Sequence, residues 1–185
     1  DRPFLVIATQ NPIEMEGTYS LPEAQLDRFI VKVEVAAPSE DDLVKILAHT
    51  TGTFAEVGAS QLDRDDLVEA QALVRELPAS TDILRRVARL VLATDPGRPT
   101  SPRQIQDAVR FGASPRGGQA LLLLAKARAF LEGRAFVSDT DIEAVAAPAL
   151  RHRLVLSYEG EASGVHADRL VAAAVKASAK ADRAQ

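Results

Sequence analysis

The sequence predicts a mainly α-helical protein that begins with two strands of an α/β sheet. Residues 4–8 (FLVIA) form an apolar run that is too short for a buried helix and is typical of a strand covered on both faces. Residues 30–35 alternate apolar and charged side chains, as in a half-buried strand. From residue 39 onward, apolar residues recur at helical spacing behind repeated helix caps. A strand that starts at Phe4 needs partners, so we expect this chain to be the C-terminal part of a longer protein.

The composition argues against several classes of protein. The 22 Lys and Arg residues against 26 Asp and Glu give a net charge of −4, which disfavours a mainly nucleic-acid-binding chain. There is no cysteine, so disulfides, thiolate chemistry and cysteine-based zinc sites are excluded. No stretch is long and apolar enough to span a bilayer, and no signal peptide opens the chain. We therefore expect a cytoplasmic protein without a membrane span.

Three helices with apolar faces are predicted first. Ala36, Ala37 and Pro38 end the second strand, and Ser39 caps a helix whose first turn is acidic. A second helix ends before Pro78, and a third follows Ser80. We expect all three apolar faces to lie in the core: Leu43, Ile46 and Leu47; Leu67, Val68, Ala70, Val74 and Leu77; Ile83, Leu84, Val87, Leu90, Val91 and Leu92.

The second half repeats a serine cap at each helix start. Ser101 is predicted to cap a short helix that ends near Gly112, and Ser114 a helix that is enclosed on most sides and stops at residues 132–133. Ser138 caps a helix to about Arg151, in which Pro148 should produce a kink or end the first half. A short strand at 153–157 and a last helix from Gly164 to about Ala177 complete the prediction.

Asn11 is the first candidate for chemistry. It follows the first predicted strand directly, and Pro12 favours an extended backbone at Asn11. In open α/β sheets, ligands bind at the carboxyl ends of strands. The ordinary alternative is that asparagine before proline starts a turn.

Arg28 is the second candidate. It ends a short amphipathic helix, just before Phe29. The ordinary interpretation is a cation that complements the helix dipole and pairs with Asp27 or Glu23.

Arg116 is the third candidate. It lies in the first turn of an N-capped helix, where the macrodipole makes a cation unfavourable by a few tenths to about 1 kcal/mol. Gly117 and Gly118 each cost about 1 kcal/mol relative to alanine inside a helix. An arginine and bare backbone at a helix start favour an anion site, whereas a solvated arginine at a frayed turn is the alternative.

Other polar residues are given structural interpretations. Arg151, His152 and Arg153 form a basic cluster that a solvated helix end explains as well as a contact with another subunit. His49 and His166 have no partner at metal-ligand spacing. The phosphate-binding pattern G-x-x-x-x-G-K-[ST] is missing, and no apolar strand ends in Asp-Glu, so this chain alone is not expected to hydrolyse ATP.

Several segments resemble a known family. ATQNP (8–12) and EGTYSLPEAQLDRF (16–29) are similar to the segment from sensor 1 to the arginine finger of MoxR-type AAA+ ATPases. GASPRG (112–117) resembles the sensor 2 motif, and LRHRL (150–154) a late lid segment. The resemblance covers most of the chain, and LPEAQLDRF with GASPRG at this separation is specific. Ser20 stands where the family usually has proline, yet residues 20–23 still form a capping-box pattern.

The resemblance implies a division of the chain and of its roles. Residues 1–36 would be the end of an α/β P-loop-type core, contributing its last two strands, and residues 37–185 a helical AAA+ lid. Asn11 would be sensor 1, Arg28 an arginine finger acting in trans, and Arg116 a sensor 2 that contacts ATP in its own subunit. Mg²⁺ and its ligands would belong to the full-length protein, outside this chain.

The implied function is that of an ATP-hydrolysing ring. Lid movement about a hinge near residues 36–39 would act on a client protein, often one with a von Willebrand A domain. Two alternatives remain: a helical protein-binding adaptor without nucleotide function, and a magnesium-chelatase-like motor subunit, which the quoted segments match less closely.

Overall fold

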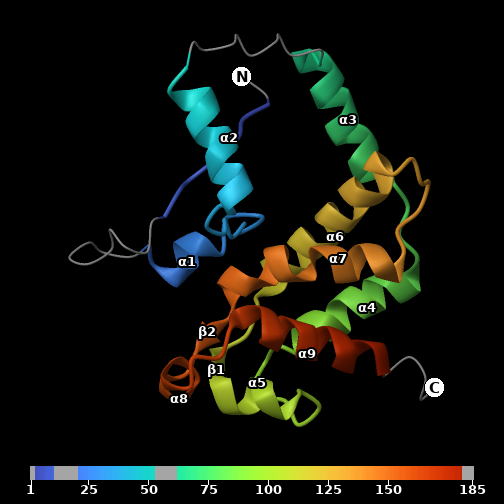
Figure 1. Cartoon of the computed structure of the whole chain (residues 1–185). Coiled ribbons are helices and arrows are strands. Elements are labelled where there is room, and N and C mark those ends of the chain that lie inside the picture. Colours follow the sequence, from blue (N-terminus) through green and yellow to red (C-terminus); the bar gives the residue numbers. More distant parts are fainter. Residues whose placement is uncertain (1–2, 11–20, 53–61, 181–185) are drawn as a thin grey trace.

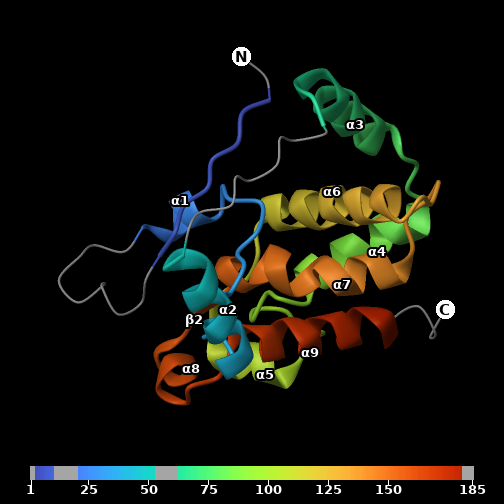
Figure 2. The same cartoon turned by 45° about the horizontal axis from the view of Figure 1, so that its top comes forward.

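Four packed helices form the centre of the molecule. The computed structural model describes residues 3–10, 21–52 and 62–180. The four helices are α4 (Thr81–Leu92), α6 (Pro115–Leu131), α7 (Asp139–Leu150) and α9 (Ala167–Lys180). Contacts join α6 to α7, α4 to α6 and α9, and α7 to α9, and Figures 1 and 2 show the four side by side. The predicted mainly α-helical fold is confirmed.

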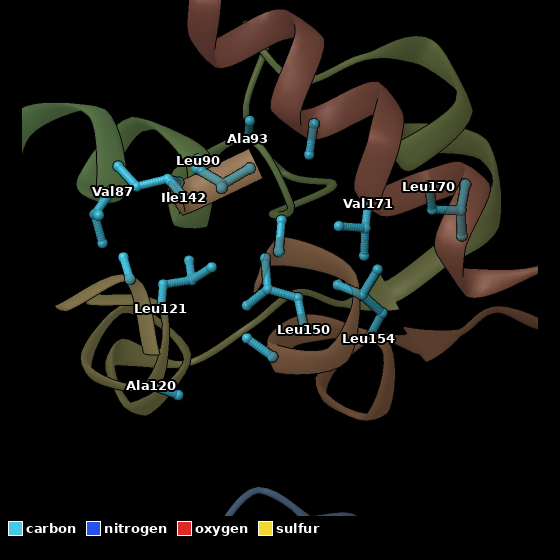
Figure 3. Packing of buried hydrophobic residues seen from close by; sticks show 14 of the residues in the cluster. Val87, Leu90, Ala93, Ala120, Leu121, Ile142, Leu150, Leu154, Leu170 and Val171 are labelled. Carbon is cyan, nitrogen blue, oxygen red and sulfur yellow. The ribbon is translucent and has the colours of Figure 1, made fainter. Parts of the chain in front are cut away.

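Apolar side chains from all four helices meet in one core. Figure 3 shows Leu90, Leu121, Ile142, Leu150 and Val171 lying around a common interior, and each is almost completely buried. Burying a side chain of this size stabilises the fold by about 1.5–3 kcal/mol. The predicted core face of α4 is confirmed at Ile83, Val87 and Leu90, but Leu84 and Leu92, which were expected in the core, are 45% and 42% exposed.

Most predicted caps are found, and one differs. Ser39 accepts the third backbone N–H of α2 (Glu40–Thr50), and Ser114 accepts the N–H of Arg116, both as predicted. Ser80, for which no cap was predicted, accepts the third backbone N–H of α4. Ser101, however, does not cap α5 (Arg103–Ala108), whose N-cap is Pro102. The Ser101 hydroxyl instead donates to the Asp95 carbonyl at 2.7 Å, so it holds the preceding loop.

The helix through Pro148 is continuous. Pro148 was expected to kink or end α7, but the helix extends to Leu150 and leads into the 3₁₀ helix η2 (Arg151–Arg153). Proline removes a single helical hydrogen bond. The Pro148 carbonyl accepts the N–H of Lys32 at 2.9 Å, so the 30–35 segment lies against the end of α7.

A small antiparallel ladder closes one end of the bundle. Strands β1 (Val109–Phe111) and β2 (Val155–Leu156) pair Val109 with Leu156, next to α5 and α8 (Tyr158–Ala162). The strand predicted within 153–157 is confirmed. The other two elements, β1 and α8, were not predicted, because three to five residues are too few to show a period.

The two N-terminal segments differ from the prediction. After residues 3–10, the helix α1 (Glu23–Leu26) is followed by an extended segment, and neither 4–8 nor 30–35 belongs to a ladder in the described structure. Phe4 is 84% exposed and Val35 91% exposed. A strand needs a neighbouring strand to pair with, and within the described residues the sheet contains only β1 and β2.

The apolar faces of α2 and α3 (Arg64–Glu76) are also not buried, contrary to expectation. Leu43, Ile46 and Leu47 of α2 are about half exposed, and neither helix has a buried residue. Figure 1 shows α2 apart from the four-helix core, while α3 contacts α6. An amphipathic pattern predicts that one face of a helix will be buried, but it does not show which part of a protein will pack against that face.

Candidate phosphate-binding site

The N-terminus of α6 holds Arg116 beside a carboxylate. The Arg116 side chain is about half exposed, and its Nη1 lies 3.7 Å from Oδ2 of Asp27. The Arg116 backbone N–H donates to Oγ of Ser114 at 3.2 Å, and the Ser114 hydroxyl donates to the Asp27 carboxylate at 3.0 Å. Asp27 therefore connects the end of α1 to the start of α6.

The glycines after Arg116 have a packing role. A Cβ on Gly117 would lie 3.1 Å from Cδ2 of Leu150 and 3.2 Å from Cδ of Arg153, which is closer than ordinary contact. A Cβ on Gly118 would meet Val91 at an ordinary 3.4 Å. The sequence suggested that both glycines expose backbone N–H groups to an anion. For Gly117 this interpretation is revised, because the missing side chain makes room for Arg153.

Arg28 is exposed and is positioned by its backbone. Its N–H donates to the Gln25 carbonyl at 3.2 Å, in the turn that ends α1. Among the described residues, no ion pair joins its side chain to Asp27 or Glu23, which was the ordinary alternative. Asp27 is already bound by Ser114 and Arg153, so the Arg28 guanidinium remains available to a ligand.

Arg153 lies at this site, although the sequence suggested only a solvated helix end or a contact with another subunit. Its side chain is 3% exposed, not part of a solvated helix end. Its Nε donates to Oδ1 of Asp27 at 3.0 Å, Nη2 donates to the carbonyls of Asp27 at 3.0 Å and Phe29 at 2.7 Å, and Nη1 donates to that of Ile30 at 3.3 Å. Burial lowers the pKa of Arg153, and the Asp27 carboxylate opposes this shift.

The two residues before Arg153 bind adjoining parts of the N-terminal segment, His152 at Phe29 and Arg151 at Lys32. The Nε2 of His152 lies 2.9 Å from both the Phe29 carbonyl and Nη1 of Arg153, and the protonation of the ring decides which of these bonds it makes. Arg151 binds Asp168 of α9 through Nε at 2.9 Å and Nη2 at 2.8 Å, and its Nη1 donates to the Lys32 carbonyl at 3.4 Å. Arg151, His152 and Arg153 therefore form a clamp inside the molecule that holds the N-terminal segment. A run of charges in a sequence does not show whether the cluster is buried or exposed.

Arg28 and Arg116 line one hollow. The hollow has a volume of about 400 Å³, and its wall consists of Asp27, Arg28, Ile30, Arg116, Gln119, Ala120, Leu123 and Arg153. Three guanidinium groups face one carboxylate, which leaves an excess of positive charge. Guanidinium groups bind phosphate oxygens through charge-assisted hydrogen bonds, so this wall suits a phosphate group. Asn11 lies outside the described residues.

A second polar cluster does not suit a metal ion. Glu34, His166 and Asp168 have ligand atoms within 4.8 Å of one another. Arg151 lies inside this group, 2.8 Å from Asp168 and 3.9 Å from Glu34, so the carboxylates already have a cationic partner. The cluster is an ion-pair network that fastens the 30–35 segment to α9.

Comparison with known proteins identifies the class as an AAA lid with part of its ATPase core. The AAA lid domain family matches residues 103–178, and the ATPase family associated with various cellular activities (AAA) matches residues 1–31. Chaperone MoxR1 of Mycobacterium tuberculosis is 37% identical over 163 residues, which is 88% of this chain and 43% of the relative. The magnesium-chelatase 38 kDa subunit of Acidiphilium rubrum is 32% identical over 92% of this chain and 46% of its own length.

A solved structure agrees with these relatives. The crystal structure of a proposed ATPase from Cytophaga hutchinsonii superposes with a TM-score of 0.88 at 32% identity, over 95% of this chain and 54% of that one. The chain belongs to the MoxR-type AAA+ ATPases. It spans about half the length of the relatives it matches. In the described residues, no helix is both long and apolar enough to cross a bilayer.

Proposed function

We propose that this chain is the lid and adjoining core segment of a cytoplasmic AAA+ ring that binds and hydrolyses ATP to remodel or mature partner proteins. The observation that carries the proposal is the shared hollow of Arg28 and Arg116. These residues are 88 positions apart in the sequence, yet both guanidiniums border a pocket whose charge suits a triphosphate.

The two arginines would act on phosphate oxygens. Arg28 is the finger offered to the nucleotide of the neighbouring subunit, where a planar, permanently charged fork stabilises developing charge and contributes roughly a thousandfold or more in rate. Arg116 binds the γ-phosphate from the lid. The family resemblance assigns Arg116 to the ATP of its own subunit. The shared hollow supports a second arrangement, in which one protomer presents both residues to the same phosphate group.

Asn11 and Mg²⁺ complete the proposed site. The neutral amide of Asn11 would orient the attacking water. The only carboxylate in the wall of the described hollow is Asp27, which Arg153 and Ser114 already bind. The hollow therefore does not fit a magnesium site, and Mg²⁺ would be held by residues outside this chain. For the same reason we expect this chain alone to be inactive.

The action on a client would use the lid. A hinge near residues 36–39, between the clamped 27–34 segment and α2, would let ATP turnover move the lid, which we propose comprises residues 37–185 after a core segment of residues 1–36. A client with a von Willebrand A domain is the first candidate for the partner. A magnesium-chelatase-like motor is the second candidate function, because a subunit of that enzyme is 32% identical to this chain.

Subunit mixing in the full-length protein tests the proposal. Arg28→Ala should reduce ATP turnover by roughly a thousandfold, and activity should return when these subunits are mixed with subunits that lack the P-loop lysine but keep Arg28. A cis residue cannot be rescued in this way, so Arg116→Ala separates the two arrangements. Arg103→Ala, at an exposed position on α5, is the control. A full-length protein that does not hydrolyse ATP would instead support the adaptor.

A further inference from the structure

The backbone on both sides of Arg28 is held by one side chain. Arg153 donates to the carbonyls of Asp27, Phe29 and Ile30, and its Nε binds the Asp27 carboxylate. Arg28 itself lies inside this set of bonds, while its own side chain is left exposed. The result is a fixed Cα position and direction for Arg28.

The other side of the clamp belongs to the lid helices. Arg153 also donates to the Ala149 carbonyl of α7, and its aliphatic stem packs against Gly117 of α6. Asp27 is bound in addition by the α6 N-cap, Ser114. A buried guanidinium with this many acceptors is costly to displace, because any new position would leave its charge and the Ala149 carbonyl without their buried partners.

We propose that Arg153 is a positioning residue for Arg28, and that it couples the direction of the arginine finger to the position of the lid. The functional part of this inference rests on the proposed role of Arg28. The side chain that contacts phosphate is Arg28; Arg153 acts through it. Positioning of this kind accounts for large rate factors, because a reacting group displaced by about 1 Å can lose roughly a hundredfold in rate.

Limited trypsin digestion of the full-length protein tests the positioning without any use of ATP turnover. Trypsin cleaves after arginine, so the Arg28–Phe29 bond reports directly on the clamped segment. Cleavage of a transiently opened segment follows its opening equilibrium. Arg153→Met should accelerate this cleavage by about tenfold or more, while cleavage after Arg103 in α5 should not change.

Arg151→Met is the matched control. Arg151 is a neighbouring arginine of η2 that is also largely buried, but its main partner is Asp168. Its contacts with the N-terminal segment are to Lys32 and Glu34, outside residues 27–30. It should leave cleavage after Arg28 near the wild-type rate. Arg153→Lys serves if Arg153→Met fails to fold, because lysine keeps the charge but lacks the planar fork. Unchanged cleavage after Arg28 in a folded Arg153 variant overturns the proposal.

A double-mutant cycle tests whether Arg153 acts through Arg28. Arg153→Met should lower kcat about tenfold or more with little change in the Kd for ATP, and Arg28→Ala/Arg153→Met should be no slower than Arg28→Ala alone. A further loss in the double variant overturns the proposal. If Arg28→Ala leaves turnover intact while Arg153→Met still exposes the Arg28–Phe29 bond, the positioning stands and the finger role of Arg28 is wrong.

Discussion

Nε of Arg153 lies 3.0 Å from Oδ1 of Asp27, although 126 positions separate these residues in the sequence. This contact joins η2, which follows α7, to the residue before Arg28. It shows that the segment carrying the proposed finger is attached to the lid helices and not only to the core segment that precedes it. Five measurable outcomes are expected from this site and from the helices that support it.

Gly117 and Gly118 should respond differently to alanine. Gly118→Ala should raise the free energy of unfolding by up to about 1 kcal/mol, because alanine is the better helix former and its Cβ meets Val91 at an ordinary distance. Gly117→Ala should instead lower it by about 1 kcal/mol, because overpacking against Leu150 and Arg153 exceeds that gain. Denaturant unfolding of both variants provides the measurement, and equal stabilisation by the two would refute the packing role of Gly117.

Asp141 should be important for the stability of the α6–α7 connection. It is fully buried and accepts hydrogen bonds from Arg134 and Ser138, and the Arg134 guanidinium holds its pKa well below the usual range. Asp141→Asn should cost about 2 kcal/mol at pH 7, since it leaves buried partners of a charge unmatched. Urea unfolding at pH 7 measures the loss.

The same carboxylate should make stability fall in acid. Because the folded-state pKa of Asp141 is depressed below 3.8, its contribution is present above that pH and is lost as the pH falls through the folded value. The wild-type protein and Asp141→Asn should therefore converge in stability as the pH drops below about 4. A constant difference down to pH 2 would contradict this assignment.

His152 should add a second pH dependence at a higher pH. Burial lowers the pKa of His152 below 6.5, with the nearby Arg153 and Lys32 charges acting in the same direction and the Phe29 carbonyl and Asp27 opposing it. The unfolded state then binds the proton first, so stability decreases as the pH falls below about 6.5 toward the folded value. His152→Gln should remove this component, and unfolding free energies at pH 7.5 and 5.5 compare the two proteins.

An inorganic anion should bind the hollow. Pyrophosphate at millimolar concentration should raise the Tm of the wild-type protein, because a ligand that binds only the folded state stabilises it. Arg28→Ala and Arg116→Ala should each reduce the shift, and the double variant should abolish it, whereas Arg103→Ala should behave as wild type. An undiminished shift in the double variant would place the anion elsewhere.

The sequence by itself determined the longer helices and most of their starts. Serine caps at residues 39, 80, 114 and 138, and the apolar spacing of α4, depend on interactions within one or two turns, so they can be predicted from local patterns. Arg28 and Arg116 were found because their motifs resemble a family and because a cation at a helix start is locally unfavourable. Both features are encoded within a few residues.

Only the tertiary structure decided which partners these local features find. It placed Arg28 and Arg116 on one hollow, buried the Arg151–Arg153 cluster as a clamp, and left the faces of α2 and the 30–35 segment without cover in the described chain. The physical reason is that a charge or an apolar face in a sequence specifies a need for a partner. The identity of the partner depends on contacts between residues more than a hundred positions apart, such as Asp27 and Arg153, which no local pattern contains.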